Sequence, residues 1–177
     1  MKMTTDPILG RIARTGAALS AALLLAACAS PSAIKVGETR ADVESRFPPK
    51  SRVKLADGTD RWQYPTAPMG WTALMVDFGP DGRVRSVTQA LTPDNFYKNI
   101  QPGLTKSDIQ AMLGEPGMIG WYPRLQQDVW TWRYWDQGES NQARQLDVFF
   151  SMVDGRLIYY TMTPDRAFDP GAGGDRR

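Results

Sequence analysis

Histidine is absent from this 177-residue chain, and cysteine occurs once, at Cys28. A Ser-His-Asp triad, a Cys-His pair and the Cys/His zinc sites therefore lack the residues that they need. This excludes most of the common hydrolase chemistries, and we expect neither a metal nor a cofactor. What remains available for catalysis is a pair of carboxylates.

Paired carboxylates can hydrolyse a glycosidic bond without any other catalytic group. In this chain, Asp57, Asp81 and Asp154 each precede a glycine, as is typical of turns. Asp42 and Asp108 stand where helices are expected to begin. The sequence therefore predicts that the chain is not an enzyme. A peptidoglycan-acting enzyme, with two acids facing each other in a cleft, is the third alternative among the functions considered below.

An apolar run precedes the single cysteine. Positive charges at residues 2, 11 and 14 are followed by an apolar stretch through residues 17–25, and Leu25-Ala-Ala-Cys28 ends it. This is the lipobox pattern of bacterial lipoproteins, so we expect residues 1–27 to be a signal peptide and Cys28 to be lipidated and anchored in a membrane. A transmembrane helix is the alternative, but its strongly apolar part would be about a dozen residues, whereas a span needs about 20.

Two further features concern location and partners. Ala29 follows the expected lipidation site, whereas an Asp there marks inner-membrane retention in many Gram-negative lipoproteins. We therefore expect the outer membrane, with the chain facing the periplasm. Without the three basic and one acidic residues of the leader, 18 basic and 18 acidic residues remain. A neutral chain without a Lys/Arg cluster cannot neutralise several phosphates, which excludes nucleic acid as a partner.

The chain contains an internal repeat. Residues 36–47 align with residues 102–113 at a constant offset of 66 positions. The matched pairs are Gly37/Gly103, Thr39/Thr105, Asp42/Asp108, Val43/Ile109 and Phe47/Leu113, followed by Trp62-Gln-Tyr64 with Trp132-Arg-Tyr134, Asp81-Gly-Arg83 with Asp154-Gly-Arg156, and Thr92-Pro-Asp94 with Thr163-Pro-Asp165. We expect a tether at residues 28–33, a first repeat at 34–91, a second repeat at 92–165 and a disordered tail at 166–177.

Each repeat has the pattern of a helix followed by a sheet. Thr39 and Thr105, each with an Asp three residues later, are typical N-caps and predict helices that begin there. Thr92 before Pro93 predicts another short helix ahead of Gly103. Strands are expected at 51–56, 61–64, 71–78 and 84–91, and at 118–122, 129–135, 144–151 and 156–162. The fold class is α+β, with two tandem units, each of short helices packed on one face of a three- to four-stranded antiparallel sheet.

One segment resembles a known family. Residues 96–116, Phe-Tyr-Lys-Asn-Ile-Gln-Pro-Gly-Leu-Thr-Lys-Ser-Asp-Ile-Gln-Ala-Met-Leu-Gly-Glu-Pro, with Trp132-Arg-Tyr134 and Asp154-Gly-Arg156, resemble the SmpA/OmlA domain of the barrel-assembly factor BamE. The resemblance covers nearly all of residues 92–163, and a degraded copy covers 34–92. The doubled arrangement resembles the β-lactamase inhibitor protein. The family resemblance implies a lipidated periplasmic domain that binds proteins, with the β-barrel assembly machinery as partner, and has no catalysis of its own.

Alternation along residues 130–135 separates two faces of a strand. Trp130, Trp132 and Tyr134 share one face, which we assign to the core because Trp62 and Tyr64 match it. The opposite face mixes aromatic and charged residues, as binding patches do, unless these residues pack the two repeats together. The candidate protein-binding residues on that face, with their counterparts in the first repeat and two loop residues, are Arg133, Trp135, Phe149, Trp71, Met75, Trp121 and Tyr122, accompanied by Asp77 and Asp147.

The sequence thus favours a non-enzymatic scaffold anchored in the outer membrane, in barrel assembly or envelope integrity. The alternative is an inhibitor-type module that binds a periplasmic enzyme with a doubled sheet. One concave face shared by Trp71 and Trp135 would favour inhibition, whereas repeats that point apart would favour the scaffold.

Overall fold

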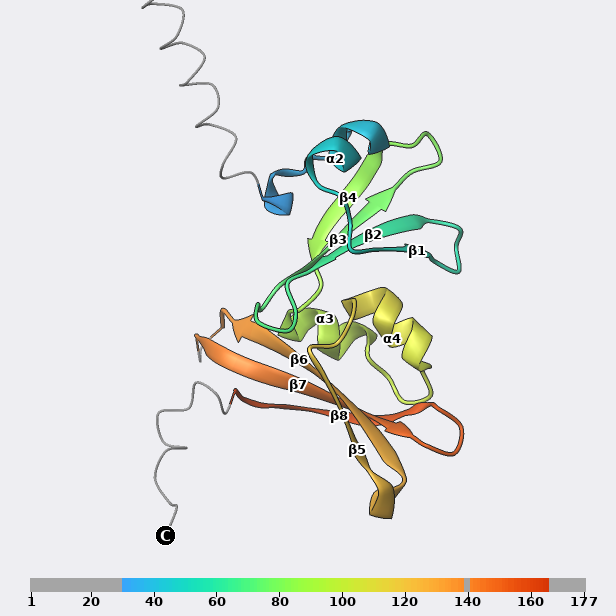
Figure 1. Ribbon diagram of the computed structural model, residues 1–177, viewed down its shortest axis with the longest axis vertical. Coiled ribbons are helices and arrows are strands. Elements are labelled where there is room, and N and C mark those ends of the chain that lie inside the picture. The colour runs from blue at the N-terminus through green and yellow to red at the C-terminus, as the bar shows by residue number, and fades with distance from the viewer. Residues whose placement is uncertain (1–29, 139–140, 166–177) are drawn as a thin grey trace, which may run out of the picture. The chain divides into compact units, whose positions relative to one another are not determined.

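The computed structural model describes residues 30–138 and 141–165, which form two four-stranded antiparallel sheets and three α-helices (Figure 1). The strand orders are β1-β2-β3-β4 in sheet 1 and β5-β6-β7-β8 in sheet 2. The α+β fold of two tandem units is therefore confirmed. The expected signal peptide, Cys28 and the tail at residues 166–177 lie outside the described residues. No helix in the described part of the chain is long and apolar enough to cross a membrane.

Every predicted helix and strand is present, with strand ends within two residues of those expected. A 3-10 turn, η1 (Pro31–Ala33), lies within the expected tether. The first repeat comprises α2 (Arg40–Arg46), β1 (Ser51–Lys54), β2 (Asp60–Pro65), β3 (Ala73–Phe78) and β4 (Val84–Gln89), and the second comprises α3 (Pro93–Asn99), α4 (Lys106–Leu113), β5 (Met118–Tyr122), the 3-10 helix η2 (Pro123–Leu125), β6 (Gln127–Asp136), β7 (Gln142–Ser151) and β8 (Leu157–Pro164).

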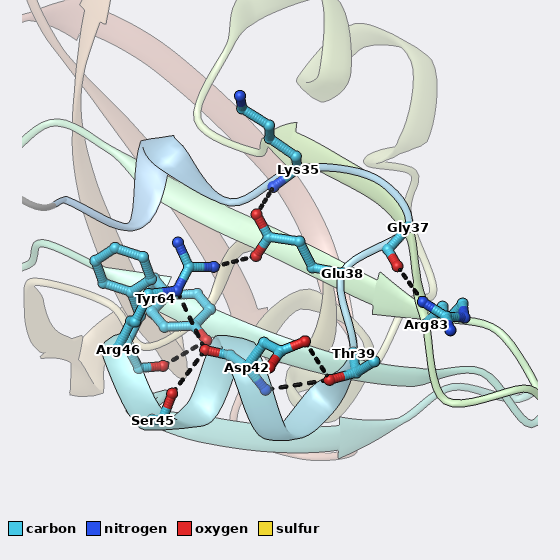
Figure 2. Close-up of polar contacts among 10 residues, drawn as sticks. Lys35, Gly37, Glu38, Thr39, Asp42, Ser45, Arg46, Tyr64 and Arg83 are labelled. Atoms are coloured by element: carbon cyan, nitrogen blue, oxygen red, sulfur yellow. Dashed lines mark hydrogen bonds and ion pairs between the residues drawn. The ribbon is translucent and has the colours of Figure 1, made fainter.

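The same loop contact recurs in both repeats and joins repeated motifs that lie far apart in the sequence. The Arg83 guanidinium donates to the Gly37 carbonyl at 2.8 Å, as Figure 2 shows, and Arg156 donates to the Gly103 carbonyl at the same distance. The two glycines have φ values of 93° and 90°, which side chains rarely adopt. Each Asp-Gly-Arg turn therefore holds the loop that starts the helix of its repeat.

Threonine caps begin both helices that follow these loops. At α2, Thr39 Oγ1 accepts from the Asp42 amide at 3.2 Å and donates to the Asp42 carboxylate at 2.6 Å (Figure 2). At α4, Thr105 makes the same contacts with Asp108, and the Thr105 amide also donates to that carboxylate at 2.8 Å. The second repeat thus has a complete capping box.

The capping box of α4 predicts a pH-dependent loss of stability in Thr105→Ala. The Thr105 side chain and then its backbone hold the pKa of Asp108 below its ordinary value. Because the folded-state pKa is the lower one, this stabilisation is present above the unfolded-state pKa and is lost as the pH falls through the folded-state pKa. Urea unfolding should show Thr105→Ala less stable by about 1 kcal/mol at pH 7, with the difference shrinking below about pH 4. The exposed Ser107→Ala is the control, and a difference that does not depend on pH would contradict this account.

Each sheet packs one face against a helix of its own repeat. In the first repeat, Val76 and Phe78 of β3 lie in a core with Val43 of α2, and in the second, Val148 and Phe150 of β7 lie in a core with Ile109 of α4. Alternate residues of β3 and β7 therefore point into the core of their own repeat. The core also holds the matched aromatic residues, which are buried as predicted: Trp62, Tyr64, Trp132 and Tyr134.

The second face of sheet 1 is covered by α4 of the second repeat. Gln63 of β2 is 1% exposed, and its side-chain amide donates to the Gln110 and Ala111 carbonyls at 2.9 and 3.0 Å. Beside it, Arg61 forms a two-pronged ion pair with Asp77, at 2.7 and 2.8 Å, and also donates to the Ala111 carbonyl at 3.3 Å. These donors bind carbonyls in the last turns of α4, where the Gln110 carbonyl also accepts from the amide of the C-cap residue Gly114.

Two expectations for the first repeat need correction. Trp71 lies before β3, because the Thr66 hydroxyl bonds both the amide and the carbonyl of Thr72 and closes a loop over residues 66–72. Met75 lies on the face of β3 opposite Val76, as alternation predicts, but it is 1% exposed and belongs to the core of the second repeat. Met75 therefore packs the repeats together and is not part of a binding surface.

Candidate functional site

The face of sheet 2 that points away from α3 and α4 carries a groove of about 830 Å³. The groove follows the alternate residues of all four strands, and one residue of the first repeat, Pro68, also lines it. The strand residues that line it, here called the open face, are Met118, Gly120 and Tyr122 of β5, Val129, Thr131 and Arg133 of β6, Gln145, Asp147 and Phe149 of β7, and Thr161 and Thr163 of β8, with Asp165 directly after β8.

Two polar pairs occupy the centre of the open face. Thr131 Oγ1 donates to Asp147 Oδ1 at 2.6 Å between neighbouring strands. Arg133 Nε donates to Asp165 Oδ2 at 2.5 Å, with side-chain exposures of 16% and 2%. This ion pair is largely removed from water, so the position of the guanidinium is fixed by the fold. The charged groups that line the groove are one cation and two carboxylates, and they sum to one negative charge.

Aromatic side chains form one end of the open face. Phe149 stacks on Tyr159 with ring centroids 4.3 Å apart and on Tyr122 at 6.5 Å. Gly120 lies next to Tyr122 on the same side of β5, and a Cβ atom there would meet no other atom within 4 Å. The missing side chain leaves space over Val129, its partner on β6. The groove thus has an apolar end and a polar centre.

The loop at residues 66–72 of the first repeat borders the groove. A Cβ atom on Gly117 would lie 3.4 Å from the Pro68 Cα atom, so the loop and the start of β5 are in close contact. Trp71 of this loop meets Trp135 of β6 edge to face, with ring centroids 5.4 Å apart, and the Arg133 guanidinium lies 5.6 Å from the Trp71 ring. Both repeats therefore contribute to the surface around Arg133.

The structure divides the predicted binding residues into four groups. Arg133, Phe149 and Tyr122 lie together on the open face, and Trp71 and Trp135 lie beside it in the contact between repeats. Trp121 is 68% exposed, and its position in the strand turns it to the other side of β5. Met75 is buried, as described above.

Sequence reasoning missed Asp165, Tyr159 and Gly120 as parts of this surface. Strand alternation could have placed Tyr159 opposite Phe149, had the register of β8 been known. Asp165 was matched with Asp94, which lies in the first turn of α3, whereas the chain at Asp165 leaves a strand. The alignment therefore carried no signal for the ion pair with Arg133.

Two acids, Asp147 and Asp165, line the groove, which bears on the peptidoglycan-acting alternative. Each carboxylate already accepts a hydrogen bond from a neighbouring side chain, Thr131 or Arg133. The described residues contain no group of three or more His, Cys, Asp or Glu placed to hold a metal ion. This geometry suits recognition of a partner better than acid–base chemistry.

Comparisons with known proteins include two distant likenesses among solved structures. No protein-family model matches the chain, and no curated protein sequence matches it. A DUF4309 family protein from Bacillus subtilis is 17% identical, with 72% of this chain and 79% of that chain covered and a TM-score of 0.29. A proposed β-lactamase inhibitor protein from Streptococcus mutans is 15% identical, with 76% and 87% covered and a TM-score of 0.29. TM-scores this low carry no argument about function.

Proposed function

We propose that the chain is a non-enzymatic protein-binding module of the bacterial envelope, that lipid on Cys28 anchors it in the outer membrane facing the periplasm, and that the open face of sheet 2 binds its partner. The lipobox motivates the location, and the structure of the second repeat motivates the surface. The two parts of the proposal are independent and can fail separately.

One observation carries the proposal. The two sheets have equivalent faces, and the face that α4 covers in sheet 1 corresponds to the face that is open in sheet 2. Trp62 and Trp132 point into their respective cores, so the next residues, Gln63 and Arg133, are matched positions on the opposite faces. Gln63 is buried against the last turn of α4, whereas Arg133 lines a groove. The repeat therefore already binds protein with this face once, within the chain.

The internal contact also indicates what kind of surface the open face fits. Gln63 and Arg61 donate to carbonyls at the C-terminal end of a helix, and a guanidinium such as that of Arg133 is favourable at that end. The covered face of sheet 1 is polar too, with Arg61, Asp77 and Gln63 all buried or nearly so. A mixture of charged and apolar groups is therefore compatible with a protein contact at this face.

The resemblance of residues 96–116 to the SmpA/OmlA domain makes the β-barrel assembly machinery the first candidate partner. In that case the module is a scaffold, and binding leaves the partner's activity intact. This finer proposal depends on the sequence motif and on none of the structural comparisons.

An inhibitor-type module is the second candidate, and the loop at residues 66–72 favours it. Met69 in this loop is 78% exposed, and Pro68 lines the groove beside it. An enzyme bound on the open face would therefore also meet a protruding apolar side chain. The two sheets do not form one doubled concave face, because α4 covers the second face of sheet 1. An inhibitor of this kind would use the second repeat and this loop.

Photocrosslinking in intact envelopes tests the binding surface. A photoreactive residue at Phe149 should capture an envelope protein, identified by mass spectrometry, because Phe149 lies on the open face. The matched control places the residue at Tyr97 of α3, which is 66% exposed and outside the groove. Capture of assembly components favours the scaffold, and capture of one periplasmic enzyme whose activity falls on binding favours the inhibitor. Equal capture from both positions would refute the open face as the binding site.

A further inference from the structure

Strand β5 stands out among the four strands at the edges of the two sheets. The outer edge of such a strand presents backbone N–H and C=O groups that can pair with another chain, and natural proteins protect it with charges, proline or bulges. Within the described residues, β5 pairs on one side, with β6, and nothing pairs with its outer edge. The absence of such protective features from an edge strand is therefore informative.

The other three edge strands carry such protection. β1 contains Arg52 and Lys54, and β4 contains Arg85. β8 ends at Pro164, which has no N–H to donate, and its Met162 carbonyl accepts from the Arg144 side chain at 3.0 Å. Each of these edges thus has a feature that opposes pairing with a further strand.

β5, Met-Ile-Gly-Trp-Tyr, contains no charge and no proline. Its four side chains are all exposed, Met118 and Ile119 at 58%, Trp121 at 68% and Tyr122 at 52%. Nine of the thirteen exposed large hydrophobic residues in the described part of the chain lie in β5, in η2, in the turn between β7 and β8, or at the start of β8. An apolar edge strand within such an exposed apolar end is the arrangement that natural proteins avoid unless the strand has a partner.

We propose that β5 pairs with β5 of a second copy of this chain, antiparallel and about a two-fold axis at Gly120. In this register Met118 faces the partner's Tyr122 and Ile119 faces the partner's Trp121, so every exposed apolar side chain meets another one. A two-fold pairing of identical edges also closes the dimer, and only the protected β8 edges then remain at the two ends of the joined sheet.

The position of Gly120 supports the axis. Gly120 is the middle residue of β5, so an antiparallel pair centred on it lets all five residues of one strand lie opposite the five of the other. A Cβ atom on Gly120 would meet nothing within 4 Å in the isolated chain. The dimer joins the two copies of sheet 2 into one eight-stranded sheet with both open faces on the same side, a consequence that is independent of whether the proposed function holds.

Disulfide trapping of the full chain in detergent tests the register. Gly120→Cys should form a disulfide dimer about tenfold or more faster than Val153→Cys, because paired strands hold the two thiols at high effective concentration. Val153 is 79% exposed but lies in the turn before β8. Met118→Cys should also be slow, because its two copies would lie about 13 Å apart along the paired strands. Wild type under the same oxidation controls for Cys28.

A second measurement tests the dimer without an introduced cysteine. Light scattering should find the wild-type chain dimeric in detergent and Trp121→Lys monomeric, with unchanged thermal unfolding because Trp121 is exposed. Either of two results would overturn the proposal: a wild-type chain that is monomeric at every concentration, or Gly120→Cys that crosslinks no faster than both Val153→Cys and Met118→Cys.

Discussion

Asp77→Ala will lower the free energy of unfolding by about 3 kcal/mol. Asp77 and Arg61 form a two-pronged ion pair with side-chain exposures of 9% and 18%, between sheet 1 and the end of α4. Removing the carboxylate leaves the guanidinium in a site with little access to water. Because Arg61 also donates to the Ala111 carbonyl, the substitution should loosen the packing of α4 on sheet 1 as well.

Glu44→Ala is the matched control for this prediction. Glu44 pairs with Arg52 on the surface, with exposures of 51% and 56%, so its loss should change stability by less than about 1 kcal/mol. Denaturant unfolding at pH 7 measures both variants. If Asp77→Ala costs no more than Glu44→Ala, the contact between the repeats does not depend on this ion pair.

Thr161→Trp will weaken partner binding by about a hundredfold, which is the second large effect. Thr161 lines the groove from β8, and a tryptophan there fills part of the groove while the charged and aromatic residues of the open face stay in place. Thr88→Trp on β4 is the matched control. Thr88 is likewise a strand threonine that is not buried, but it belongs to sheet 1. The amount of partner co-purified with each variant measures the effect, and equal losses for both would refute the groove.

The local structure of this chain could be predicted from its sequence. The caps at Thr39, Thr92 and Thr105 fix where the helices begin, and the alternation of Val148 and Phe150 fixes which face of β7 is buried. These signals depend on residues close together in the sequence. These local signals can therefore be interpreted without knowledge of how the two repeats pack together.

The contacts between repeats could not be predicted in the same way. Alternation places Met75 and Gln63 on the second face of sheet 1, but it does not indicate that α4 covers that face. The same limit explains why Trp71 was wrongly predicted to lie in a strand. Its sequence neighbours favour a strand, and the sequence does not indicate the loop that Thr66 closes. Asp165 joined the candidate site only once the register of β8 was known. Of the predicted surface, Arg133 and Phe149 lie together as the alternation of the second repeat indicates, and Tyr122, expected in a loop, lies beside them at the end of β5.

The most direct test of the account is crosslinking from Phe149 in intact envelopes, compared between the otherwise wild-type chain and Thr161→Trp. The account predicts that a defined envelope protein is captured from the first and lost from the second, while Thr88→Trp retains it. Capture that persists in Thr161→Trp, or that is equal from Tyr97, would contradict the claim that the open face of sheet 2 is where this protein binds its partner.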